Sequence, residues 1–182
     1  DVYAGLYASK ERYVDIVKVL GSQFYGMTQT EISTAIDVKT GGTLSKLLEN
    51  LMESGIIRAY PRYGKERVET VYQLIDFFSL FYLRFIQGKQ AKKGIWNSIH
   101  GTPTFYTWAG DTFELLCVEH LPQIQDTLRI ASINRNYCWS GKSPDGKGAQ
   151  IDLLLESKAD RTDYLCEMKF TGGKYAITKN DE

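Results

Sequence analysis

The sequence predicts an α+β protein with two modules, and three features of the chain lead to this prediction. Residues 9–75 contain three helical periodicities followed by an alternating hairpin pattern. Residues 104–182 contain a helical segment followed by short apolar runs that are typical of strands. Charged side chains interrupt two of these runs, at Asp152 and at Glu167. The predicted divisions are a leftover linker over 1–8, a helical and hairpin module over 9–75, a helical connector over 76–103 and an α/β module over 104–182.

The first module is expected to begin with three short helices. Thr28 followed by Glu31 is the pattern of a capping box, in which each side chain satisfies a free backbone amide at the start of a helix. Leucines repeat with helical spacing over residues 44–51. The predicted helices span Lys10–Leu20, Gln29–Ile36 and Leu44–Ser54, with Ser9, Thr28 and Thr43 as their respective caps.

A β-hairpin is expected to follow these helices. Its strands are predicted at Ile56–Tyr60 and Val68–Leu74, with a polar turn at Pro61–Lys65. Three helices followed by a hairpin is the order of a winged helix, which is a variant of the helix-turn-helix. The segment from Met27 to Leu74 resembles the winged-helix domains of many prokaryotic regulators.

The winged-helix resemblance implies a place for DNA contacts. The exposed face of the third helix is nearly neutral, whereas residues 58–67 of the hairpin contain four cations and a single acid, Glu66. Cations at the tip of a hairpin can touch phosphates without reading sequence. The alternative is a solvated turn on a module that docks against protein, and the residues leave both readings open. The candidate DNA-binding residues are Lys46, Arg58, Arg62, Lys65 and Arg67.

The connector is expected to contain one buried helix. Asp76 is a suitable cap for a helix over Phe77–Ile86, which is rich in phenylalanine and tyrosine. Because the segment is apolar on nearly all sides, we expect it to be buried.

The second module is expected to be a helix followed by three strands. Glu114 lies in the middle of the predicted helix, and the segment from Ser140 to Gly148 has the composition of a turn. The predicted elements are a helix over Thr104–Leu121 and strands over Arg129–Trp139, Ala149–Glu156 and Tyr164–Phe170.

The placement of charge on the last two strands is the main functional signal. Asp152 interrupts one apolar strand, and Glu167 and Lys169 interrupt the next on a single face. Burying such charges is costly unless they are paired or bind an ion. Neighbouring carboxylates repel each other, and a divalent cation would remove this conflict.

This arrangement resembles the PD-(D/E)XK nuclease superfamily, which has a restriction-endonuclease-like fold. Asp152 matches the family's first acid, Glu167-Met168-Lys169 matches its Glu-x-Lys, and Glu114 in "AGDTFELLC" matches its helical Glu. Ile151 replaces the proline of the pattern, and the chain ends before the last helix and strand of the usual core. The resemblance implies that Asp152, Glu167 and Glu114 bind Mg²⁺ and that Lys169 assists the attacking water or the phosphate.

The whole order of segments resembles the C-terminal region of prokaryotic ATPases of the AAA type. In that group a nucleotide-binding module comes first, and a winged helix and a nuclease-like domain follow. This chain has no GxxxxGK[ST] loop, so we expect ATP to bind elsewhere in the parent protein. The implied function is an accessory region that binds DNA and hydrolyses phosphodiester bonds with Mg²⁺. The competing prediction is a non-catalytic docking module that anchors or regulates the ATPase.

Composition sets limits on these predictions. The formal net charge is zero, so nucleic-acid binding would depend on local patches. The three cysteines are scattered and give no zinc spacing, which favours a reducing compartment, and we expect a cytoplasmic protein. No apolar run approaches the length of a membrane span. Because the chain starts at Asp1 and ends in a polar stretch, we expect it to be a piece of a longer protein.

Overall fold

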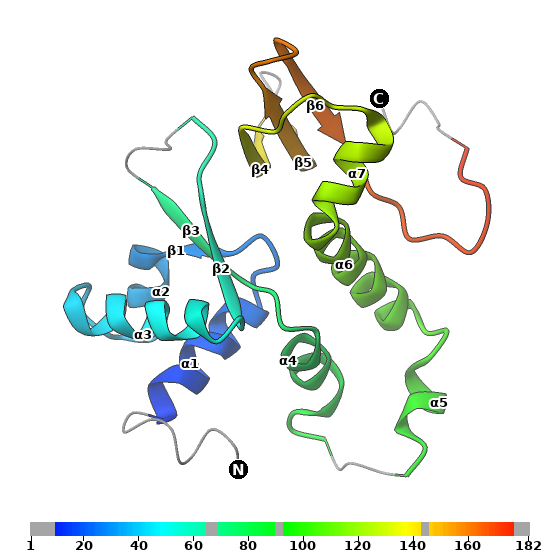
Figure 1. Ribbon diagram of the computed structural model, residues 1–182. Coiled ribbons are helices and arrows are strands. Elements are labelled where there is room, and N and C mark those ends of the chain that lie inside the picture. Colours follow the sequence, from blue (N-terminus) through cyan, green and yellow to red (C-terminus); the bar gives the residue numbers. More distant parts are fainter. Residues whose placement is uncertain (1–9, 65–68, 90–92, 143–145, 177–182) are drawn as a thin grey trace. The chain divides into compact units, whose positions relative to one another are not determined.

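The computed structural model describes residues 10–64, 69–89, 93–142 and 146–176. The chain divides into two compact units, Asp1–Ile95 and Trp96–Glu182, each of which contains helices and a small antiparallel sheet (Figure 1). The predicted α+β class is therefore confirmed. The division between the units falls inside the predicted connector.

In the described part of the first unit, three helices lie next to a three-stranded sheet, and a short α-helix and a π-helix follow the sheet along the chain (Figure 1). The strand order is β1–β3–β2, and both pairings are antiparallel. The short first strand, which we had not predicted, pairs Met27 with Tyr72 and Thr28 with Val71. The elements are α1 (Lys10–Gly21), β1 (Met27–Thr28), α2 (Gln29–Ala35), α3 (Gly42–Glu53), β2 (Ile57–Pro61), β3 (Thr70–Leu74), α4 (Phe77–Phe81) and the π-helix η1 (Tyr82–Ile86).

The predicted helix starts are confirmed for α2 and wrong for α3. The Thr28 hydroxyl accepts from the amide of Glu31, whose carboxylate accepts in return from the amide of Thr28 at 2.7 Å. The helix α3 is capped by Gly41 rather than Thr43, because the amide of Ser45 already donates to the Gly41 carbonyl at 3.0 Å. The predicted cap Ser9 lies outside the described residues.

The core of the first unit joins the three helices to the sheet. Its fully buried side chains come from every helix and from both long strands. Gln73 is also buried, and its amide donates to the carbonyl of Phe24 at 2.6 Å. The apolar members of this core are Ile16, Leu20, Ile32, Leu44, Leu48, Ile57 and Leu74.

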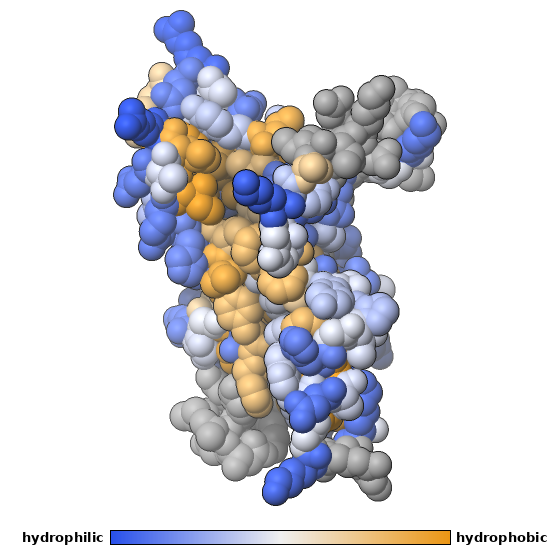
Figure 2. Space-filling view, turned by 90° about the vertical axis from the view of Figure 1, so that its right-hand side faces the viewer, coloured by the Kyte–Doolittle hydropathy of each residue, from blue (hydrophilic) through white to orange (hydrophobic). Residues whose placement is uncertain are grey.

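The aromatic helix is not buried on all sides, which corrects the prediction. Asp76 caps it as expected, with its carboxylate accepting from the amide of Ser79 at 2.7 Å. Phe85 is buried, but Phe78 is 71% exposed and stacks with the exposed Tyr82. Exposed apolar residues are also visible as orange side chains at the molecular surface (Figure 2).

The second unit is a run of helices followed by a three-stranded meander in the order β4–β5–β6. Thr102 caps α6, and its hydroxyl accepts from the amide of Phe105. The elements are α5 (Ile95–Ile99), α6 (Pro103–Glu119), α7 (Leu121–Leu128), β4 (Arg135–Lys142), β5 (Gly148–Ser157) and β6 (Thr162–Cys166).

The helix α7 was not predicted, and it displaces the start of the first strand. Residues predicted as strand from Arg129 follow this helix, and Arg129 itself ends it in a left-handed conformation. Leu121, the first residue of α7, and Ile130, two residues after its end, are buried with Leu153 and Leu155 of β5. Burial of these two residues stabilises a helix whose eight residues would be marginal alone.

The last strand is shorter than predicted. We expected it to run to Phe170, but its ladder with β5 ends at the pair Leu153 and Cys166. The next amide to point at β5, that of Met168, donates to the side chain of Asp152 instead of to a carbonyl. None of the helices within the described ranges is long and apolar enough to cross a lipid bilayer.

Candidate functional site

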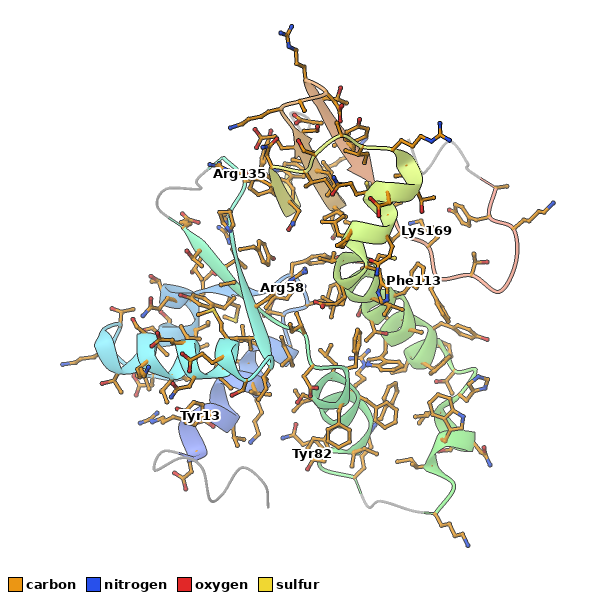
Figure 3. All side chains as sticks on the ribbon, viewed as in Figure 1. Tyr13, Arg58, Tyr82, Phe113, Arg135 and Lys169 are labelled. Atoms are coloured by element: carbon orange, nitrogen blue, oxygen red, sulfur yellow. The ribbon has the colours of Figure 1, made fainter. Side chains whose placement is uncertain are left out.

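The four predicted site residues come from three elements of the second unit. Glu114 lies on α6, Asp152 lies on the central strand β5, and Glu167 and Lys169 lie just after β6. The segment after β6 returns to α6, since the ring of Phe170 lies 6.0 Å from that of Phe113. Figure 3 labels Phe113 and Lys169 in this region. The fold therefore brings a helix, a strand and a loop together around the predicted acids.

Asp152 is a buried carboxylate with two hydrogen-bond donors. It is 5% exposed, between a half-buried isoleucine and a run of buried leucines. Its Oδ2 accepts from the amide of Met168 at 2.9 Å, and its Oδ1 accepts from Nε2 of Gln150 at 3.3 Å. Hydrogen bonds to both oxygens offset part of the desolvation of the charge. Asp152 consequently fixes the loop that carries Glu167 and Lys169 against β5.

The charges of the other three predicted site residues all affect the pKa of Glu114. The pKa of its carboxyl is raised from 4.5 to about 8, first by burial and then by the charges of Asp152, Asp111 and Glu167, while the charge of Lys169 acts in the opposite direction. Electrostatic effects of this kind require proximity, because solvent screens distant charges. The predicted acids and amine therefore share one local field, in which Glu114 is mainly protonated at neutral pH.

Glu167 and Lys169 form an ion pair at the exposed side of the site. The Lys169 ammonium donates to Oε1 of Glu167. The side chain of Lys169 is 38% exposed and that of Glu167 is 45% exposed. The hydrogen bond with Glu167 and the charge of that carboxylate raise the pKa of Lys169 above its ordinary value. The amine is thus held in its charged form, which suits electrostatic stabilisation better than proton abstraction.

The donor chemistry suits a hard divalent cation, but the side chains are not arranged as a finished ligand set. Carboxylate oxygens are the ligands that Mg²⁺ prefers. Among the residues that the structure describes, no three His, Cys, Asp or Glu side chains are placed to hold a metal ion together. Asp152 is hydrogen-bonded to Met168, and Glu167 is paired with Lys169. Cation binding would require these side chains to reorient.

Two features of the site were missed in the sequence. Asp111 acts on Glu114 from one helical turn earlier, and the i, i+3 spacing of the two acids on a predicted helix would have indicated this. The hydrogen bond from the Met168 amide to Asp152 has no signal in the sequence, because it joins residues 16 positions apart.

Replacing Glu114 with glutamine tests the raised pKa directly. The folded state holds the Glu114 proton more tightly than the unfolded chain, so this contribution to stability is lost as the pH rises from 4.5 towards about 8. In the presence of a chelator, wild type is expected to lose about 1 to 2 kcal/mol relative to Glu114→Gln across this window, allowing for partial exposure of the group. Denaturant titrations at several pH values measure the difference.

The exposed Glu119 of the same helix provides the matched control for this comparison. Glu119→Gln removes the same carboxyl chemistry away from the acids. If both variants follow wild type in parallel from pH 4.5 to 9, the shared field around Glu114 is not supported.

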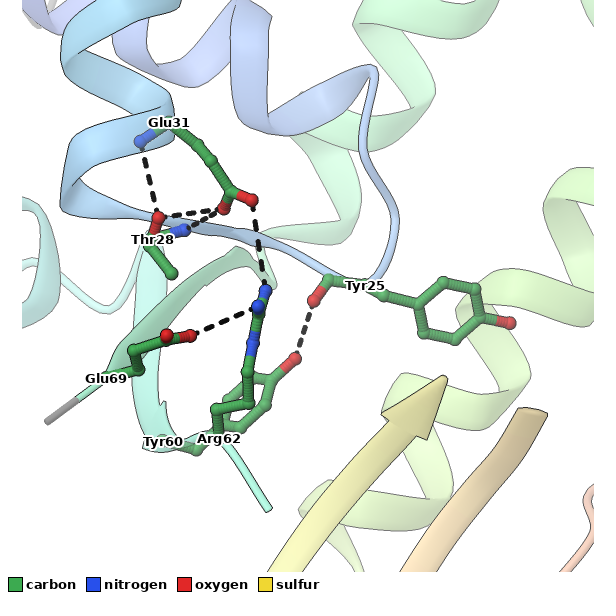
Figure 4. A network of polar contacts seen from close by, with 6 residues as sticks. All are labelled: Tyr25, Thr28, Glu31, Tyr60, Arg62 and Glu69. Atoms are coloured by element: carbon green, nitrogen blue, oxygen red, sulfur yellow. Dashed lines mark hydrogen bonds and ion pairs between the residues drawn. The ribbon is translucent and has the colours of Figure 1, made fainter. Parts of the chain in front are cut away.

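Three of the candidate DNA-binding residues, Lys46, Arg58 and Arg62, lie in the described part of the first unit and have contacts there, which Figure 4 shows for Arg62. Arg62 pairs with Glu69 at 3.1 Å and with Glu31 of the capping box at 3.9 Å. Arg58 donates to Gln73 at 2.8 Å. On α3, Lys46 pairs with Glu49 at 2.7 Å.

The hairpin is also tied to the loop before β1, since the Tyr60 hydroxyl donates to the Tyr25 carbonyl at 2.6 Å (Figure 4). Lys65 and Arg67 lie outside the described residues. Of the five candidates, the three described ones therefore have carboxylate or amide partners within their own unit.

Comparison with known proteins gives no relative: no family model, no curated protein and no solved structure matches this chain.

Proposed function

We propose that the second unit is a nuclease-like domain of the PD-(D/E)XK type that hydrolyses phosphodiester bonds with Mg²⁺. The observation that carries the proposal is the placement of these side chains: the buried Asp152 accepts from the amide of Met168, which lies between the paired Glu167 and Lys169. In keeping with this placement, burial and the charges of Asp152, Asp111 and Glu167 raise the pKa of Glu114 to about 8. Acids brought together from a helix, a strand and a loop, with an ammonium beside them, are typical of sites that bind a cation and a phosphate.

The chain's own residues have distinct roles in this proposal. Asp152 and Glu167 would hold the cation, and Glu114 would lose its proton to join them or to orient bound water. The cation would lower the pKa of a bound water and offset charge on the phosphate. Lys169, which is held in its charged form, would neutralise charge that develops on the phosphate oxygens.

The arrangement of the first unit supports a winged helix as the DNA- or protein-facing part of this region. The element order α1–β1–α2–α3–β2–β3 and the sheet order β1–β3–β2 agree with such a module. The resemblance noted from the sequence implies an ATPase module N-terminal to both units. We propose that the two units form the accessory region of that ATPase.

Mg²⁺ titration followed by calorimetry tests the catalytic proposal. We expect a saturable heat at millimolar Mg²⁺ and a larger heat when DNA is present. We also expect cleavage of plasmid or single-stranded DNA that stops when a chelator is added. A chain that gives neither heat nor cleavage would contradict the proposal.

A second function, non-catalytic docking, is favoured by the contacts of the hairpin. The charge of Arg62 is offset by Glu69 and Glu31, and the guanidinium of Arg58 is held by Gln73, so the hairpin offers less to phosphates. A docking module predicts weak DNA affinity that changes little between about 50 and 200 mM salt, whereas several phosphate contacts predict a loss of at least tenfold. Fluorescence anisotropy with a labelled duplex distinguishes the two.

A further inference from the structure

The ammonium of Lys169 occupies a particular place among the acids. It is bonded to Oε1 of Glu167, which is one of the oxygens that the proposed function assigns to a cation. It also acts on Glu114 with a sign opposite to that of the three acids, and it is influenced by Asp152. Lys169 thus lies within electrostatic reach of Glu114, Asp152 and Glu167.

We propose that the ammonium of Lys169 is a built-in counter-ion of this cluster, which a divalent cation must displace from Glu167 in order to bind. The inference rests on the proposed function. An oxygen that accepts a charge-assisted hydrogen bond is less available to a metal, so the two cations compete for Glu167.

The same competition gives an order of events. Lys169 is 38% exposed and has a flexible four-carbon stem, so it can leave Glu167 at small cost. Once displaced, its charge has no carboxylate partner at Glu167 and can meet a substrate phosphate. Cation binding would therefore release Lys169 towards the phosphate, and the centre would be assembled only when the cation is present.

Calorimetric Mg²⁺ titrations of three proteins test this inference: wild type, Lys169→Met and Lys158→Met. Lys158 is the matched control because it pairs with Glu156 at 4.0 Å in the same unit, so both variants lose one exposed positive charge. Lys169→Met is expected to bind Mg²⁺ about threefold to tenfold more tightly than wild type, and Lys158→Met within about twofold. On adding Mg²⁺, the rise of the thermal midpoint of unfolding is expected to be larger for Lys169→Met than for wild type or Lys158→Met.

Lys169→Arg, which keeps the positive charge, is expected to bind Mg²⁺ as wild type does. Circular dichroism checks that each variant is folded, and Lys169→Gln replaces the methionine variant if that variant is not. Equal or weaker Mg²⁺ binding by Lys169→Met overturns the counter-ion role, while binding by wild type still supports the proposed function. Absence of Mg²⁺ binding in every protein overturns both.

Discussion

Replacing Asp152 with alanine is expected to abolish both the heat of Mg²⁺ binding and Mg²⁺-dependent cleavage of DNA. Asp152 is the buried acid of the cluster, and it also accepts hydrogen bonds from Met168 and Gln150. The alanine variant removes a proposed cation ligand and leaves the amide of Met168 without the acceptor that Asp152 provides. We therefore also expect a loss of about 1 to 3 kcal/mol in the free energy of unfolding.

Asp152→Asn separates these two effects. The amide oxygen of asparagine can still accept from the Met168 amide, but the negative charge is gone. This variant is expected to keep most of its stability and to lose Mg²⁺ binding as completely as the alanine variant. Asp163→Ala, at an exposed position on β6, controls for loss of charge alone. Mg²⁺ heat retained in Asp152→Asn would show that Asp152 only fixes the loop.

Replacing Gly26 with alanine is expected to cost the first unit about 3 to 5 kcal/mol in free energy of unfolding. Gly26 has a φ of +78°. A Cβ there would lie 2.4 Å from the carbonyl oxygen of Tyr72 and 2.9 Å from Cγ1 of Val71. Both residues belong to β3, so relief of the clash would disturb its pairing with β1. Denaturant unfolding followed by far-UV circular dichroism measures the loss.

Gly55 is the control position, because its φ of +68° is similar but nothing lies within 4 Å of a Cβ placed there. Gly55→Ala is expected to cost only the backbone term of about 1 to 2 kcal/mol. Equal costs for the two substitutions would mean that the loop before β1 does not approach β3 as closely as described.

Local sequence signals predicted those features that depend on neighbouring residues. The capping box of Thr28 and Glu31 and the cap at Asp76 were correct, because each joins residues three positions apart. The hairpin strands were placed within two residues of their ends at Ile57 and Thr70. By contrast, Thr43 was predicted as the cap of α3 because its hydroxyl can accept a hydrogen bond. The helix is instead capped by Gly41, without a side-chain hydrogen bond.

Features that depend on distant contacts were missed. The helix α7 is short, and burial of its first residue, Leu121, and of the following Ile130 against β5 supports it. The end of β6 at Cys166 follows from a side chain on another strand, that of Asp152. The aromatic helix is apolar in sequence, yet its exposed side at Phe78 depends on what the fold places around it.

The sequence by itself determined which residues form the candidate site. An acid in an apolar strand, a Glu-x-Lys on the next and a glutamate on a helix are visible as charges in positions where charge is costly. Only the tertiary structure decided how they meet. It places Glu114 in the field of Asp111, Asp152 and Glu167, and it pairs Lys169 with Glu167. The physical reason is that side-chain type is set one residue at a time, whereas burial and Coulomb interaction depend on distances that exist only after the chain has folded.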